Sequence, residues 1–226
     1  MSEVGDLEYV GYAVNSYLTH SLYMGNPLAE VERDSRRYLA LVTRLKHEFQ
    51  RTYVRVSLQM TLNLEGQAAD PRRMVGEIFD ETVTVPELLA ANNMTTACLF
   101  YVSSATLSYL FGDYQEALRI CGTASGYLNA MLGQVTVVQH NFYESLSRLA
   151  LAAEASDEER DEHLAHVDDN QAKLKQWSLH APENFHHKHA LVVAERNRVT
   201  GRHTEAMGAY DEAIEAASKQ GFVGDE

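Results

Sequence analysis

Two stretches of the sequence share one pattern: Gly112-Asp113-Tyr114-Gln115-Glu116-Ala117 and Gly201-Arg202-His203-Thr204-Glu205-Ala206. Each follows a helical stretch and opens another, and glycine favours the left-handed conformation that ends many helices. Small residues recur at matching distances from the two glycines: Ala105, Ala124, Ala194 and Ala213. Because small residues let helices approach closely, the pattern predicts two closely packed, antiparallel helix pairs.

A third junction, Met24-Gly25-Asn26-Pro27, also places a glycine between two helical stretches. Asn26 is expected to cap the second helix, with Pro27 at its first position, where the missing N–H is tolerated. Glu30 stands where the other two junctions carry a small residue. This unit therefore follows the pattern less closely.

The spacings resemble the tetratricopeptide repeat family, whose units are pairs of antiparallel helices. The residues that carry the resemblance are Gly25, Ala105, Gly112, Tyr114, Ala117, Ala124, Ala194, Gly201, Ala206, Tyr210 and Ala213. The resemblance implies an all-α chain of antiparallel helix pairs, stacked as an irregular tetratricopeptide-like superhelix (an α-α solenoid). We expect a single domain over residues 1–226, with approximate pairs at 6–46, 47–81, 87–131, 134–178 and 183–220.

The least regular segment follows a helix expected over residues 47–65. Asp70-Pro71 is expected to cap a short helix that reaches about Phe79. The β-branched run Thr82-Val83-Thr84-Val85 precedes a proline, so residues 81–86 are expected to form an extended break. We therefore predict an insertion near residues 66–92.

The last third of the chain is expected to be helical throughout. A long apolar helix is predicted over residues 135–154. Ser156-Asp157-Glu158-Glu159 matches a capping box and should open a helix that reaches about Trp177. The final helix is predicted over residues 203–220. Because no polar helix follows to cover it, we expect a fragment of a longer protein, with an exposed end that could form a homodimer.

Several stretches are similar to the helical region of large bacterial multidomain signalling kinases. They lie at residues 5–13, 25–32, 109–114 and 201–217, and most specifically at Phe185-His186-His187-Lys188-His189-Ala190. Those proteins join a Ser/Thr kinase-like domain, a P-loop ATPase, this helical region, a GAF domain and a sensor histidine kinase. The resemblance implies flanking ATPase and histidine kinase modules as partners, and it transfers no catalytic residue to this chain.

Composition and missing motifs exclude several classes of function. The net charge of −13 disfavours nucleic acid and anionic membranes as partners. No Walker loop, kinase catalytic loop, G-x-S-x-G elbow or HExxH motif occurs, so we expect no enzyme activity in this segment and no cofactor. The two cysteines, Cys98 and Cys121, form no CxxC pair, and we expect neither a signal peptide nor a membrane span. A cytoplasmic location is therefore expected.

Histidines form the sharpest candidate for a metal site. His186 and His189 lie three residues apart and could share a helix face, and His203 follows across the glycine turn. Helix packing is the favoured interpretation, so no metal is expected.

Tyrosines are the candidates for ligand contacts. Most are expected to fill the core, but Tyr9, Tyr12, Tyr101 and Tyr109 could anchor a peptide in a concave groove. Two functions remain open. The first is a non-catalytic scaffold that mediates protein–protein interaction, and the alternative is a sensor that binds a small molecule or peptide in the groove.

Overall fold

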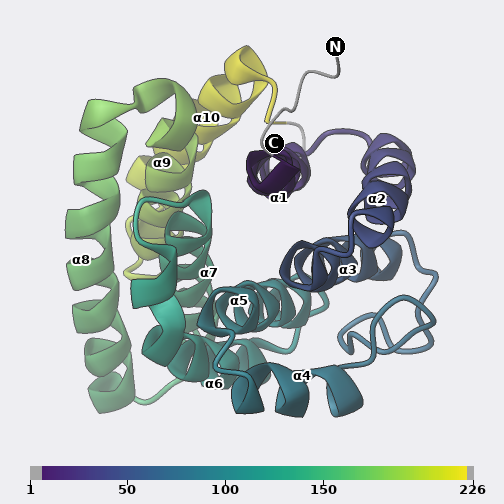
Figure 1. Ribbon diagram of the computed structural model, residues 1–226. Helices are drawn as coiled ribbons and strands as arrows, with labels where there is room; N and C mark the ends of the chain where they lie inside the picture. Colours follow the sequence, from purple (N-terminus) through teal and green to yellow (C-terminus); the bar gives the residue numbers. More distant parts are fainter. Residues whose placement is uncertain (1–6, 223–226) are drawn as a thin grey trace.

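The computed structural model describes residues 7–222, with side chains from residue 9 onward. Within this range the chain is all-helical, with ten α-helices and one 3₁₀ helix (Figure 1). They are α1 (Leu7–Tyr23), α2 (Leu28–Arg44), α3 (Glu48–Leu64), α4 (Glu81–Ala90), α5 (Met94–Leu110), α6 (Tyr114–Ala124), η1 (Ser125–Met131), α7 (Val135–Ala152), α8 (Asp157–His180), α9 (Pro182–Val199) and α10 (His203–Gln220). The predicted all-α class is confirmed.

The helices alternate between two roles. The odd-numbered helices α1, α3, α5, α7 and α9 contact one another in chain order. The even-numbered helices pack against odd neighbours: α2 on α1 and α3, α4 on α5, α6 on α5 and α7, α8 on α7 and α9, and α10 on α9. Figure 1 shows the result as a curved row of helices from α2 through α5 to α8.

Most turns between helices use one hydrogen-bonding arrangement. At the α5–α6 turn Gly112 has a φ of 81°; its N–H donates to the Tyr109 carbonyl, and the Asp113 N–H donates to the Ser108 carbonyl. This pair of bonds is the Schellman motif. The glycine junctions predicted at Gly25 and Gly201 adopt it too, and both glycines have positive φ.

Two further helix ends have the same motif without glycine. Lys46 after α2 has a φ of 58°, and Asn92 after α4 has a φ of 54°. The N–H of the residue that follows each donates to the carbonyl of Val42 or Leu88. These turns escaped the sequence analysis because no glycine marks them.

The segment between α3 and α4 corrects the prediction in two ways. No helix forms over residues 71–79; instead, turns and an isolated bridge between Val75 and Asp80 fill this stretch. The expected break over residues 81–86 is instead the first part of α4, because the Asp80 side chain caps the helix by accepting from the Thr82 N–H. Pro86 lies inside α4, which removes one hydrogen bond without ending the helix.

The other predicted helices agree closely with the structure. α3, α7 and α10 cover the ranges expected for them, and the capping box at the start of α8 is confirmed by the reciprocal bonds of Ser156 and Glu159. At α2 the prediction was wrong in detail: Pro27 precedes the helix, and no side chain caps it. The expectation of an uncovered end falls partly on residues 223–226, which lie outside the described range.

The core is continuous along the odd-numbered helices. Its largest cluster joins α1, α3 and α5, with Met60, Phe79, Leu99 and Leu107 among its buried side chains. A second cluster joins α7, α8 and α9 around Phe142, Leu149 and Leu174. No helix within residues 7–222 is long and apolar enough to cross a lipid bilayer.

Candidate functional site

An apolar cavity of about 420 Å³ lies where α1, α7, α8 and α9 meet. Its aromatic lining comes from four parts of the chain: Tyr23, Trp177, Phe185 and Phe222. Aliphatic side chains of Leu132, Val135, Val137 and Val138 complete the wall. Binding sites for small ligands are usually concave, mostly apolar and about 300–1,000 Å³ in volume, so this cavity falls within their range.

A second cavity, of about 370 Å³, adjoins the first. It lies between the α1–α2 turn, α3, α5 and α7, and Leu28, Met60 and Leu64 contribute to its lining. Tyr23 and Gln139 line both cavities. These two side chains therefore form the wall between them.

Two buried polar atoms around this wall have no hydrogen-bond partner: the Thr106 hydroxyl and the side-chain oxygen of Gln139. Burial raises the pKa of Tyr23, and hydrogen bonding to the Ser103 and Thr136 hydroxyls opposes that rise. An unpaired buried polar atom costs about 1–3 kcal/mol, so such a cluster calls for an explanation.

Lys188 is the one lysine in the lining of the apolar cavity, and it is buried. Its Nζ atom lies 4.6 Å from the centroid of the Phe142 ring, which is a cation–π contact. The adjacent His187 is also buried, and its ring lies 4.2 Å from the ring of Phe222. These contacts join α9 to α7 and to Phe222, two residues after the end of α10.

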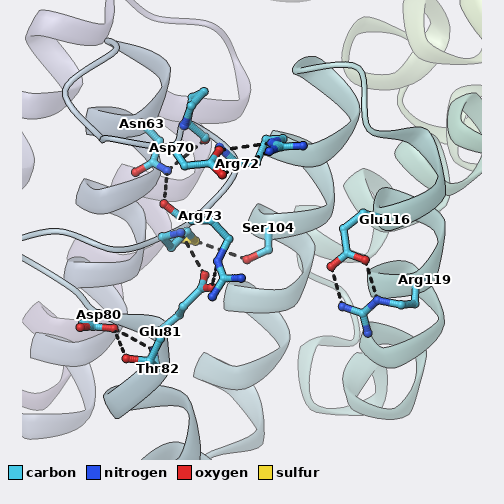
Figure 2. A network of polar contacts seen from close by, with 12 residues as sticks. Asn63, Asp70, Arg72, Arg73, Asp80, Glu81, Thr82, Ser104, Glu116 and Arg119 are labelled. Carbon is cyan, nitrogen blue, oxygen red and sulfur yellow. Dashed lines mark hydrogen bonds and ion pairs between the residues drawn. The ribbon is translucent and has the colours of Figure 1, made fainter.

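A polar pocket on α5 and α6 contrasts with the apolar cavity. It measures about 490 Å³ and holds three arginines, which Figure 2 shows together with Asp70, Glu81 and Glu116. Arg72 contacts Asp70 at 3.2 Å and Asp113 at 3.0 Å, Arg119 makes two 2.6 Å bonds to Glu116, and Arg73 pairs with Glu81. Each arginine therefore already faces a carboxylate, and the pairs of Arg72 and Arg73 join the loop between α3 and α4 to α6 and α4.

The residues of the predicted repeat signature lie at helix contacts. Ala105, Ala117, Ala124, Ala194, Ala206 and Ala213 are all buried. The rings of Tyr114 and Tyr109 are 5.4 Å apart, and the Tyr210 hydroxyl donates to Glu195, whose charge also acts on Tyr109. The two matching junctions are therefore linked through Tyr109.

The four tyrosines proposed as groove aromatics do not line the apolar cavity as far as the structure describes it. Tyr9 and Tyr12 are exposed on α1, with Tyr12 6.5 Å from the Phe49 ring. Tyr101 lines the polar pocket and stacks on Tyr127 at 5.3 Å. Tyr109 lies among Tyr114 and Tyr143, and burial raises its pKa to about 12.

The predicted histidines lie at helix contacts or on the surface. The Nε2 atom of His186 is 2.8 Å from a Glu212 oxygen, which joins α9 to α10. His189 is half-buried, and burial lowers its pKa, while His203 is exposed at the start of α10. Within residues 7–222 no three potential ligands gather to hold a metal ion. Burial raises the pKa of both cysteine thiols to about 12, which disfavours the reactive thiolate.

Sequence reasoning missed Tyr23, Gln139, Trp177, Phe185 and Phe222 as a group. These residues lie on α1, α7, α8 and α9 and after α10, and only the folded chain places them around one cavity. A useful signal was the unusual number of hydroxyl and amide residues on the otherwise apolar α5 and α7.

The comparisons with known proteins gave no match: no family model, no curated protein and no solved structure is similar to this chain.

Proposed function

We propose that the chain is a non-catalytic helical-repeat module that binds other protein domains. In this proposal its helix pairs form an irregular tetratricopeptide-like superhelix, and the ligand site is the apolar cavity between α1, α7, α8 and α9. Support for the repeat comes from the chain-order contacts of the odd-numbered helices and from the shared turn at Gly112 and Gly201. Stacked pairs of this kind create one concave face that is suited to binding.

The observation that carries the proposal is the exposed rim of the cavity. Leu132 and Met24 line the cavity, yet 70% and 39% of their surfaces remain accessible. A small molecule inside the cavity would leave this rim in water. A protein partner would fill the cavity with an anchor and cover the rim at the same time, which is the usual arrangement at an interface.

The resemblance to multidomain signalling kinases suggests which proteins these are. We propose ATPase and histidine kinase modules of the same cytoplasmic signalling protein as the partners, with binding at one end of the helical row biasing the other. Self-association as a homodimer is a further form that this interaction could take.

The proposal is tested by titrating the purified chain with those modules and measuring the binding affinity by calorimetry. Leu132→Asp should weaken binding about tenfold, because it places a carboxylate on the apolar rim. Leu179→Asp is the matched control, since Leu179 is 66% exposed but is not part of the cavity lining. Equal affinity of both variants, or no binding to any module, would contradict the proposal.

A second candidate function is a sensor that binds a small molecule in the same cavity. The unpaired oxygen of Gln139 favours it, because it offers a polar contact inside an apolar site. A metabolite screen by thermal shift tests this candidate. A compound that stabilises the wild-type chain, but not a variant with Val138→Trp filling the cavity, would support it.

A further inference from the structure

We propose that the anchor which enters the apolar cavity is a tyrosine side chain of the partner protein, with its ring in the cavity and its hydroxyl at Gln139. This inference rests on the proposed binding function and names the chemistry that the site selects. It predicts that the site prefers a phenol, whereas a purely apolar cavity would bind any ring of similar size.

The lining of the cavity favours a flat ring. Aromatic side chains approach it from α1, α8, α9 and Phe222 beyond α10, and branched side chains of α7 also line it. Aromatic pairs gain about 0.5–1.5 kcal/mol beyond the burial of their area. The cavity volume of about 420 Å³ leaves room for one such ring.

The polar atoms at the wall favour a hydroxyl on that ring. The Gln139 oxygen is an acceptor without a donor, and Gln139 is only 2% exposed. The terminal torsion of a glutamine amide is broad, so the oxygen can turn toward either cavity that the residue lines. A phenol would donate to this oxygen and could accept from the hydroxyl of Thr106, which is also unpaired.

Charged anchors fit this site less well. Among the described residues of the lining there is no carboxylate that would neutralise an incoming lysine or arginine. An acidic anchor would have to lose its hydration among the aromatic rings, which is costly for an ion, and Lys188 is already engaged by other contacts of the chain. A neutral anchor with one polar tip avoids both costs.

The chain carries its own probe for this site. Trp177 lines the cavity and is the single tryptophan of the sequence, so its fluorescence reports on occupancy directly. Two probe ligands, p-cresol and toluene, differ by the hydroxyl alone. Each is titrated against the intact chain, the variant Gln139→Leu and the matched control Gln176→Leu, which alters an exposed glutamine of α8.

The hydroxyl of p-cresol loses its hydrogen bonds to water when it enters the cavity. Without a hydrogen-bond partner in the cavity, p-cresol would therefore bind more weakly than toluene. We expect the opposite order in the wild type, with p-cresol about fivefold tighter, and toluene tighter in Gln139→Leu. Gln176→Leu should behave as the wild type. Thr106→Val, a near-isosteric change in the adjoining cavity, should reduce the preference for p-cresol partly.

The outcomes distinguish a failure of the tyrosine anchor from a failure of the proposed binding function. A wild type that prefers toluene, or a preference for p-cresol that survives Gln139→Leu, overturns the tyrosine anchor and leaves the apolar cavity as a binding site. If neither compound changes the fluorescence of Trp177, the cavity binds no ring, and the proposed binding function fails together with the anchor.

Discussion

The α5–α6 pair and the neighbouring segment between α3 and α4 pack against the rest of the chain in different ways. One is a pair of helices, and the other is a loop. α6 follows α5 after a short turn and packs closely because Ala117, Cys121 and Ala124 are small and fully buried. After α3 the chain instead runs through residues 65–80 without a helix. Large side chains anchor that loop, and Met74 and Phe79 have no exposed surface.

The difference shows what a loop needs when it takes the place of a helix. Backbone groups in a helix satisfy one another, whereas a buried loop needs outside partners. Polar residues of α3 supply them. Asn63 donates to the carbonyls of Pro71 and Arg73, Gln59 accepts from the Phe79 N–H, and Arg55 donates to the Ile78 carbonyl.

The largest effect is expected where the loop relies on one side chain. Phe79 packs against Phe100 of α5, with their ring centroids 5.8 Å apart. Phe79→Ala would leave a cavity at this point and should lower the free energy of unfolding by about 3–5 kcal/mol. Urea unfolding followed by circular dichroism measures it. Val83→Ala, an exposed site on α4, is the control, and an equally small effect of both changes would show that the loop does not anchor this region.

A smaller effect should distinguish the two kinds of turn. Gly112 has left-handed geometry with open space around the position of a Cβ atom, so Gly112→Ala should cost about 1–2 kcal/mol from backbone conformation alone. Lys46 adopts the same geometry without glycine, so Lys46→Gly should stabilise the chain by up to about 1 kcal/mol. Thermal unfolding of both variants checks the opposite signs. Two shifts of the same sign would contradict the assignment of strain to Lys46.

These turns also show what the sequence could predict about the fold. Glycine is a local signal, so the ends of α1, α5 and α9 were predictable from single residues. Lys46 and Asn92 adopt left-handed geometry because the helices on both sides fix it, and no local pattern records that constraint. The loop after α3 was mistaken for a helix because Asp70-Pro71 matches a helix start, whereas the structure of this loop depends on Asn63 and Gln59 of the preceding helix.

The candidate site was less predictable than the fold. A tyrosine-rich first helix drew attention to Tyr9 and Tyr12, but only Tyr23, at the end of that helix, lines the apolar cavity. The residues of α7, α8 and α9 that line this cavity with Tyr23 follow more than a hundred residues later. Long-range contacts of this kind produce no periodic pattern of residues, so they cannot be predicted from a single sequence.

The smallest effect concerns the charges that hold the loop to α6. Hydrogen bonds from Arg72 hold the pKa of Asp70 below its usual value of 3.8, and Arg72 also reaches Asp113, which caps α6. Because the folded pKa is lower than the unfolded one, Asp70 stabilises the fold above pH 3.8. This contribution is lost as the pH falls through the folded pKa.

Asp70→Asn keeps the side-chain oxygen that accepts from the Arg72 N–H but removes the charge. The variant should therefore be less stable than the wild type at neutral pH, and the gap should close below pH 3.8. The gap should also be smaller than the effect of Gly112→Ala, because both side chains are well exposed and solvent screens the pair. Urea midpoints measured across this pH range provide the test. A gap that stays constant would mean that the loop is held by its backbone bonds to α3 and by the burial of Phe79, with no contribution from this ion pair.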